Sequence, residues 1–207
     1  LLMARVIICR HGNTFDSGDT VRRVGARTDI SLSISGIEQA KFLAEQFSTL
    51  KSGYNFSRAY CSPLERTKST CAYILSKGHK AKIPTILNFL KEIDYGPDEN
   101  KKESYVIKRL GIKALDLWDL QGISPEGWLV DTEEIISSWK LFLESLIDTN
   151  EDILVVTSNG IARFLFDAVH NIEVTMTRKL NTACFGLIEV NHSTTSLKFW
   201  NKKTLEC

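Results

Sequence analysis

The sequence predicts an α/β fold with three layers, α/β/α, in which helices cover both faces of a mostly parallel central sheet, in a single domain over residues 1–207. Short apolar runs, such as residues 6–9 and 152–157, have the length and composition of strands buried on both faces. Segments with apolar residues at helical spacing lie between such runs, an alternation typical of parallel sheets. With 43% hydrophobic residues, the chain can bury one core of this kind.

The composition argues against several classes of protein. The 26 basic and 25 acidic residues leave a net charge of +1, which gives no reason to expect binding to nucleic acid or to a membrane surface. The apolar runs are far shorter than the ~20 residues of a membrane span, and the first residues lack the features of a signal peptide. The 5 cysteines have no paired spacing, which favours free thiols. We therefore expect a cytoplasmic protein.

The first strand ends in Arg10, His11, Gly12, Asn13 and Thr14. In open α/β sheets, ligands bind just outside the carboxyl ends of the strands. Arg10 offers a planar set of donors suited to phosphate or carboxylate. His11 can act as a nucleophile through one ring nitrogen if the other donates to a backbone carbonyl. Because Gly12 has no Cβ, a ligand can approach the backbone there, and the segment as a whole predicts an anion site.

The loop over residues 15–28 follows this anion site and carries three arginines, Arg22, Arg23 and Arg27. A run of charges in a loop often only faces solvent. Here the arginines come directly after the anion site, so we select Arg27, together with Arg23, as candidates for binding an acidic substrate.

The next expected elements are a helix and a second strand. Ser33 or Ser35 can cap a helix that runs to about residue 50, and residues 54–61 form the strand. The apolar face of the helix is expected to comprise Ile37, Ala40, Phe42, Leu43 and Phe47.

A second basic segment follows that strand. Ser62 and Pro63 predict the start of a helix, with serine as its cap and proline in its first turn, and Gly78 is a typical stop. A helix that begins here points free amide groups at the expected anion. Arg66, one turn into the helix, should face back towards the loop after the first strand.

The remaining elements are assigned by the same criteria of apolar spacing and turn residues. They are strands over residues 83–90 and 152–157, helices over residues 100–127, 131–148 and 161–169, and two strands over residues 181–190 and 196–200. We expect the last two strands to form a hairpin at the edge of the sheet.

Five segments in this order resemble the histidine phosphatase superfamily, the phosphoglycerate mutase-like proteins. They are residues 10–14, 32–40, 62–67, 92–96 and 155–160, and together they span nearly the whole chain. The resemblance implies a phosphatase or mutase whose histidine becomes phosphorylated during the reaction.

The resemblance also implies roles for particular residues. His11 would attack phosphorus to form a phosphohistidine, while Arg10 and Arg66 bind the phosphoryl oxygens. Glu92 would protonate the leaving alcohol, with Asp94 as the competing candidate for this role. The expected partner is a small phosphorylated substrate, and the mechanism needs no metal or organic cofactor. The sequence leaves open whether the chain forms a homodimer.

The strand over residues 152–157 ends where the chain departs from its family. The resemblance leads us to expect a second histidine there that contacts the phosphoryl group, but this chain has Ser158, followed by Asn159. We assign these two side chains, with Asn13, to phosphate binding because all three can donate hydrogen bonds. Losing one strong donor to a developing charge typically costs ~10²–10³ in rate, which weakens an enzyme without abolishing activity.

These observations predict a phosphatase that hydrolyses a small phosphorylated metabolite, with activity reduced by the change at Ser158. The chain is short, whereas true glycolytic mutases of the family usually carry longer insertions, so phosphoglycerate mutase-type transfer is the less favoured alternative. The other alternative is a catalytically weak protein that binds a phosphorylated ligand. The identity of the substrate does not follow from the sequence.

Overall fold

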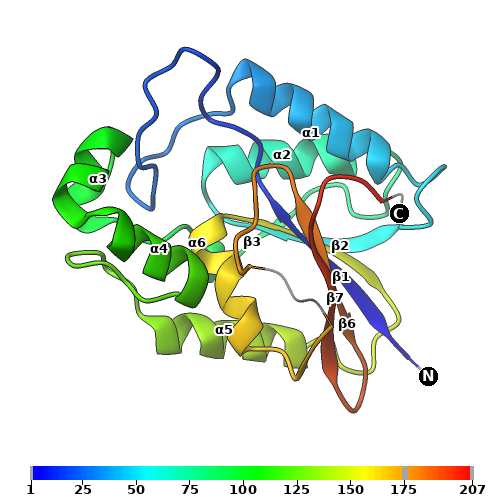
Figure 1. Ribbon diagram of the computed structural model, residues 1–207. Helices are drawn as coiled ribbons and strands as arrows, with labels where there is room; N and C mark the ends of the chain where they lie inside the picture. Colours follow the sequence, from blue (N-terminus) through cyan, green and yellow to red (C-terminus); the bar gives the residue numbers. More distant parts are fainter. Residues whose placement is uncertain (1, 174–176, 206–207) are drawn as a thin grey trace.

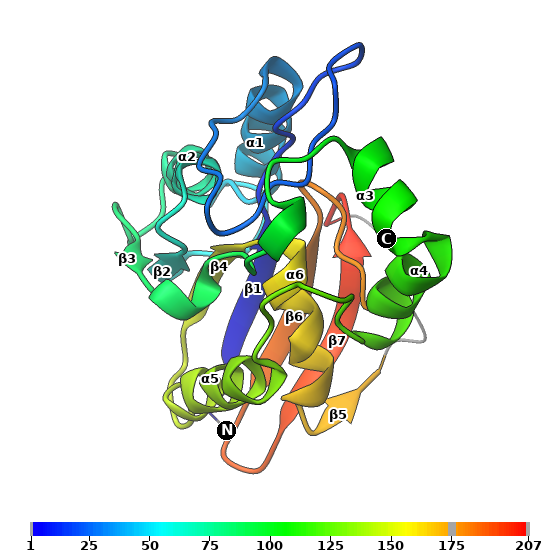
Figure 2. The ribbon, with the colours of Figure 1, turned by 90° about the vertical axis from the view of Figure 1, so that its left-hand side faces the viewer.

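The computed structural model describes residues 2–173 and 177–205. A central sheet, mostly parallel, runs through the described part of the chain, with helices on both sides (Figures 1 and 2), which confirms the predicted α/β/α fold. Its strands, in spatial order, are β3 (Thr85–Ile86), β2 (Phe56–Cys61), β4 (Asp152–Thr157), β1 (Ala4–Arg10), β6 (Phe185–Val190), β7 (Thr195–Lys202) and β5 (Asn171–Ile172).

Each face of the sheet has its own apolar core. α1 (Ile34–Gln46) and α2 (Glu65–Leu75) pack on the face that carries Ile7 and Cys9, whereas α5 (Thr132–Glu144) packs on the face that carries Val6 and Ile8. Because successive strand residues point to opposite faces and both faces are covered, the middle of β1, from Val6 to Cys9, is apolar throughout.

The carboxyl ends of the central strands lie together. β1 and β4 are parallel, and Arg10 pairs with Thr157 at their last aligned position. Beyond this edge lie the loop after β1 and two short helices, α3 (Glu103–Leu110) and α4 (Ile112–Gln121), as Figure 1 shows. The residues expected to carry the chemistry therefore emerge at one edge of the sheet.

α1 starts where the sequence predicted. The Ser33 side chain accepts a hydrogen bond from the Gly36 amide, which makes Ser33, rather than Ser35, the N-cap. The assignment of Phe42 to the apolar face is wrong, because this side chain is 49% exposed. Its neighbour Leu43 occupies the buried face, and a step of one residue turns a helix by about 100°.

The predicted start of α2 is also wrong. Leu64 is the N-cap residue and makes no side-chain cap bond, so the helix begins at Glu65. The Ser62 hydroxyl instead accepts from the Leu64 amide and bonds the Thr67 hydroxyl, which ties together the turn that precedes the helix. The helix ends at Leu75, before the expected stop.

Three other segments are shorter or more broken than predicted. The strand expected over residues 83–90 contains only β3, followed by the 3-10 turn η1 (Asn88–Leu90). Here the Leu87 amide donates to the Cys61 carbonyl oxygen, and the Leu90 carbonyl oxygen accepts from the Thr157 hydroxyl, so the chain crosses the ends of β2 and β4. Gly111, at a φ of 79°, separates α3 from α4. The helix expected over residues 161–169 is α6 (Asn159–Ala162) continued by the tighter η3 (Arg163–Asp167).

The last two strands form the predicted antiparallel hairpin, in which Ile188 pairs with Leu197. Their expected place at the sheet edge is wrong. β6 pairs with β1 inside the sheet, and the short strand β5 pairs with the outer side of β7.

Two further predictions concern thiols and membranes. The four cysteines in the described residues are free, and Cys207 lies outside those residues. Among residues 2–173 and 177–205, no helix has the length and apolar character to cross a membrane.

Candidate active site

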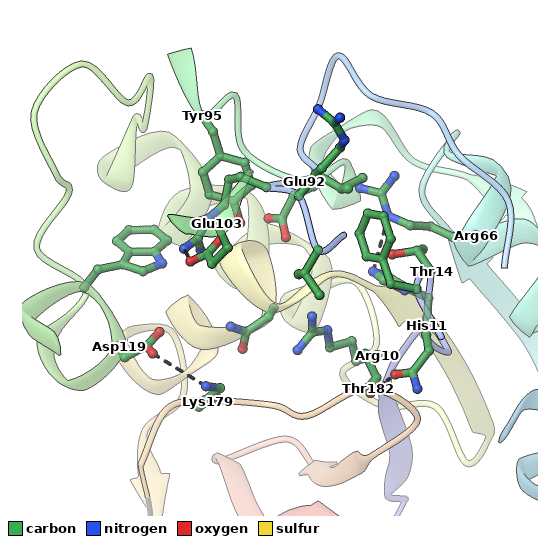
Figure 3. Close-up of a pocket in the computed structure, with 18 of the residues that line it drawn as sticks. Arg10, His11, Thr14, Arg66, Glu92, Tyr95, Glu103, Asp119, Lys179 and Thr182 are labelled. Atoms are coloured by element: carbon green, nitrogen blue, oxygen red, sulfur yellow. Dashed lines mark hydrogen bonds and ion pairs between the residues drawn. The ribbon is translucent and has the colours of Figure 1, made fainter. Parts of the chain in front are cut away.

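A cavity of about 490 Å³ opens at the carboxyl ends of β1 and β4 (Figure 3). The loop after β1, α2, the segment after β3, α4 and the segment after β4 all contribute to its wall. Of the predicted site residues, the structure places around this cavity Arg10, His11, Asn13, Arg23, Arg66, Glu92 and Asn159.

His11 is buried at the centre of this arrangement. Its Nδ1 lies 2.7 Å from the Gly12 carbonyl oxygen, and its Nε2 lies 3.3 Å from Nε of Arg66. Because a carbonyl can only accept, Nδ1 carries the proton and Nε2 keeps its lone pair. Burial, together with the charges of Arg66 and Arg10, holds the His11 pKa well below its ordinary value of 6.5. The ring is therefore neutral at neutral pH.

Arg66 approaches His11 from α2 and is almost fully buried. Its terminal nitrogens donate to the carbonyl oxygens of Thr28 at 2.9 Å and Gly25 at 3.3 Å. The loop after β1 thus fixes the guanidinium beside the imidazole, and the predicted direction of this side chain agrees with its observed contacts. Burial lowers the Arg66 pKa below its usual value, but a guanidinium stays charged at neutral pH.

Arg10 forms another cationic part of the cavity wall. One terminal nitrogen donates to the Leu180 carbonyl oxygen at 2.9 Å. Its buried Nε has no hydrogen-bond partner among the described residues. A buried donor of this kind is costly unless something accepts its proton. This N–H is therefore available to an anion that enters the cavity.

Glu92 faces Arg10 across the cavity (Figure 3). One carboxyl oxygen accepts from the Ile93 amide at 3.0 Å, and the other accepts from the Gly160 amide at 3.3 Å. A Cβ on residue 160 would lie 2.2 Å from Oε1 of Glu92, so this close approach requires glycine. The backbone after β4 thereby positions the carboxyl group.

Asp94, the competing candidate for proton donor, has a different environment. Its carboxylate accepts from Nε of Arg27 at 2.7 Å, and this bond is the main cause that holds the Asp94 pKa below its usual value. Neither Asp94 nor Arg27 lines the cavity. An ionised carboxylate outside the cavity is poorly suited to protonate a leaving group, which favours Glu92.

The two arginines selected for substrate binding are therefore separated in space. Arg27 donates to Asp94 and to the Gly96 carbonyl oxygen, away from the cavity. Arg23 lines the cavity, forms an ion pair with Glu103, and lies 5.3 Å from the ring centre of Tyr95.

The neutral residues assigned to phosphate binding also differ in position. Asn13 and Asn159 line the cavity, and their carbonyl oxygens accept from the Thr182 hydroxyl and the Leu180 amide, respectively. Ser158 is fully buried and does not line the cavity, and its hydroxyl has no partner among the described residues.

Arg163 is a cavity residue that the sequence interpretation missed. It is fully buried, and its guanidinium carbon lies 4.1 Å above the centre of the Trp118 ring. Its Nε donates to the Asn159 carbonyl oxygen at 3.3 Å, while a terminal nitrogen lies 3.3 Å from Asp119. The sequence signal for this residue is a cation shortly after the loop that follows a strand, whereas helical spacing alone predicts only a helix here. Lys179 and Asp119 were missed as well.

The fold and the site together define an enzyme-like anion site, in which a buried neutral imidazole lies between guanidinium groups, with a carboxyl group opposite. This arrangement suits phosphoryl transfer. The family model of the histidine phosphatase superfamily (branch 1) matches residues 6–203. The chain belongs to this superfamily, as its motifs predicted.

Curated relatives are similar over part of their length. The chain is 27% identical to the 2,3-bisphosphoglycerate-dependent phosphoglycerate mutase of Haemophilus influenzae over 114 residues, which cover 55% of this chain and 48% of that enzyme. For the corresponding protein of Pasteurella multocida the identity is 26% over the same length. The matched region thus spans about half of these relatives.

Solved structures resemble the whole fold. The phosphoglycerate mutase of Bacillus anthracis has a TM-score of 0.76 at 17% identity, covering 98% of this chain and 94% of that chain. The alpha-ribazole phosphatase of Shigella flexneri has a TM-score of 0.67 at 22% identity, covering 98% of both chains. A mycobacterial glucosyl-3-phosphoglycerate phosphatase has a TM-score of 0.72 at 17% identity, covering 96% and 99%. At these identities the likeness shows a shared fold.

Proposed function

We propose that this protein is a phosphatase that hydrolyses a small phosphomonoester through a phosphohistidine on His11. The observation that carries the proposal is the state of the ring. Nδ1 donates to the Gly12 carbonyl oxygen, and the lone pair of Nε2 accepts from Nε of Arg66 in the wall of the cavity. A nucleophile with a fixed tautomer next to cationic donors is what attack on phosphorus requires.

In the first step, the Nε2 lone pair of His11 forms a bond to phosphorus as the bond from phosphorus to the ester oxygen breaks. Glu92, in its protonated form, gives its proton to the departing alkoxide, which leaves as an alcohol. Arg10 and Arg66 bind the equatorial oxygens and offset the negative charge that collects on them.

In the second step, water attacks phosphorus and the bond to Nε2 breaks. The Glu92 carboxylate accepts the proton of the attacking water, so that inorganic phosphate leaves and His11 returns to its neutral form. Asn13 and Asn159, which line the cavity, are proposed to add neutral donors to the phosphoryl oxygens, whereas the buried Ser158 is not given this role. With serine in place of the second histidine, we expect a rate ~10²–10³ lower than that donor would allow.

The test is intact-mass and phosphopeptide analysis after brief exposure to an aryl phosphate, together with release of inorganic phosphate. The parent protein should carry an acid-labile phosphoryl group on His11 and release phosphate, whereas His11→Ala should do neither. A folded parent protein that binds phosphate but forms no adduct and shows no turnover would contradict the proposal and favour a ligand-binding role. Activity that requires catalytic amounts of a bisphosphorylated primer would favour a mutase.

A further inference from the structure

Glu99 is a buried acidic residue that the proposed mechanism does not use. It lies in the segment after β3, and only 9% of its surface is exposed. Its Oε1 accepts from the Gly25 amide at 3.0 Å, the Arg27 amide at 3.0 Å and the Thr28 hydroxyl at 2.8 Å. Its Oε2 accepts from the Tyr95 amide at 3.0 Å. One carboxylate thus binds four donors, three of them in the loop after β1.

Two of these donors belong to residues that also bind Arg66. The Thr28 carbonyl oxygen accepts from one terminal nitrogen of Arg66 at 2.9 Å, and the Gly25 carbonyl oxygen accepts from the other at 3.3 Å. Nε of the same guanidinium donates to Nε2 of His11 at 3.3 Å. Hydrogen bonds therefore run from the Glu99 carboxylate, through the loop and Arg66, to the nucleophile.

The contact between the loop and Glu99 leaves no room for a side chain at Gly25. A Cβ there would lie 2.4 Å from Oε2 of Glu99 and 2.6 Å from the Ile93 carbonyl oxygen. The same carbonyl oxygen accepts from the Ala26 amide at 2.9 Å. The backbone of the loop comes this close to the carboxylate because residue 25 is glycine.

Arg66 benefits from a support of this kind. An arginine side chain has many rotamers, and fixing one of them costs entropy. If the loop fixes the guanidinium before substrate binds, the reaction itself does not have to meet that cost. The charge of Glu99 also acts on Arg66, because burial lowers the Arg66 pKa and nearby acids, among them Glu92 and Glu99, oppose this effect.

We propose that Glu99 is a positioning residue for the phosphatase reaction, which holds Arg66 beside His11 and the phosphoryl group through the loop after β1. Glu99 does not line the cavity, so it touches neither the substrate nor the reacting atoms. This inference rests on the proposed function, because that function gives Arg66 its role in binding the phosphoryl oxygens.

The first experiment replaces the carboxylate by an amide of the same shape. In Glu99→Gln one oxygen becomes an amino group, which cannot accept, so the charge is lost and at least one donor loses its partner. The loop should then hold Arg66 less firmly. We expect the affinity for inorganic phosphate, measured by calorimetry, to fall about tenfold, as the loss of a charge-assisted hydrogen bond implies.

The same change in an Arg66→Ala background shows whether Glu99 acts through Arg66. Two residues that act as one unit have effects that do not add. Once the guanidinium is absent, Glu99→Gln should reduce the affinity for phosphate by less than about twofold. Equal losses in the two backgrounds would overturn the proposal, because Glu99 would then affect the cavity by another route.

The titration of His11 is a readout that a purely structural role of Glu99 would not change. Burial is the main cause of the low His11 pKa, and the charge of Arg66 is the next. Displacement of Arg66 in Glu99→Gln should therefore raise the His11 pKa, followed by histidine NMR signals that His11→Asn assigns. Loss of the negative charge at residue 99 would by itself act in the opposite direction.

Asp98→Asn is the matched control for loss of a buried carboxylate. Asp98 precedes Glu99 in the sequence and is fully buried, but its carboxylate bonds Arg109 and Trp128 instead of the loop after β1. This change should lower the stability of the protein and leave the His11 pKa where it is in the parent protein.

Thr28→Val tests the same connection with a smaller disturbance of the fold. It removes one of the four donors and keeps the shape of the side chain, whereas Thr28→Ser keeps the hydroxyl. The valine variant should bind phosphate more weakly and have a higher His11 pKa than the serine variant. No difference between these two variants, or an unchanged His11 pKa in folded Glu99→Gln, would overturn the proposal.

The inference and the proposed function can fail separately, because phosphate binding and the titration of His11 need no turnover. If Glu99→Gln shows both changes but the parent protein does not hydrolyse an aryl phosphate, the phosphatase is contradicted and the effect of Glu99 on Arg66 stands. Hydrolysis by the parent protein, with neither change in Glu99→Gln, would overturn only the positioning role.

Discussion

At the scale of single residues, Ser158 and Arg163 distinguish what can be predicted from the sequence from what cannot. The sequence shows that Ser158 departs from the motif. It does not predict that this side chain is completely buried and lies away from the cavity surface. Arg163 was overlooked because helical spacing says which face a side chain occupies only when the helix is regular, and here α6 passes into η3 at that residue.

The change Ser158→His tests the interpretation of this position. A histidine that reaches the phosphoryl group would add a strong donor, so we expect the phosphatase rate to rise by about tenfold or more, within the range of such donors. The site is tightly packed, and overpacking can cost about 1–3 kcal/mol in stability. Steady-state rates should therefore be measured together with thermal unfolding.

Ser158→Asn is the matched control for this prediction, because it adds volume and a neutral amide without a cation. A folded Ser158→His protein with no gain over Ser158→Asn would count against the alignment of this loop with the second family histidine.

At the scale of elements, the ends of β1 and β4 were predictable because long apolar runs that stop at polar residues leave little choice of structure. The ends of the helices were less predictable from the sequence than the ends of these strands. Ser33 and Ser62 are both good caps by residue type, yet only Ser33 caps a helix, since the Ser62 hydroxyl is held by the turn before α2. Local propensity cannot decide between such competing local bonds.

The contact between α6 and Glu92 gives a prediction at this scale. In Gly160→Ala the new Cβ would come within 2.2 Å of Oε1 of Glu92, so the carboxyl group must move away from its present position. We expect kcat for an alkyl phosphate to fall by about 10²-fold, the lower range for loss of a general acid.

An aryl phosphate with an acidic leaving group distinguishes displacement of the proton donor Glu92 from a general disturbance of the fold. Such a leaving group departs without a proton, so Gly160→Ala and Glu92→Gln should both lose far less activity on it than on an alkyl phosphate. Equal losses on the two substrates would mean that Gly160 supports the fold rather than the position of the proton donor.

At the scale of the whole molecule, the net charge does not indicate that cations are concentrated around one cavity. A value of +1 describes the chain correctly, but the folded chain gathers cations around one cavity from segments far apart in the sequence, among them Arg10, Arg66, Arg163 and Lys179. The fold class followed from periodicity alone, whereas this concentration of charge depends on tertiary contacts that periodicity does not contain. Cytoplasmic location and oligomeric state stay predictions.

Burial of His11 links this cavity to the stability of the whole protein. In the unfolded chain a histidine has a pKa of about 6.5, while burial and two arginines hold the folded pKa of His11 well below that value. Between these two pKa values the unfolded state binds more protons, so the free energy of unfolding should decrease as the pH falls from about 7 through 6.5. One such group changes the free energy of unfolding by at most about 1.4 kcal/mol per pH unit.

Denaturant unfolding between about pH 7.5 and 5.5 in phosphate-free buffer, on the parent protein and His11→Asn, measures this contribution. Burial also lowers the pKa of His79, which acts in the same direction and is common to both proteins. The parent should therefore lose more stability than the variant as the pH falls. Parallel curves for the two proteins would contradict a depressed pKa at His11, and the neutral nucleophile on which the proposed mechanism depends would lose its physical basis.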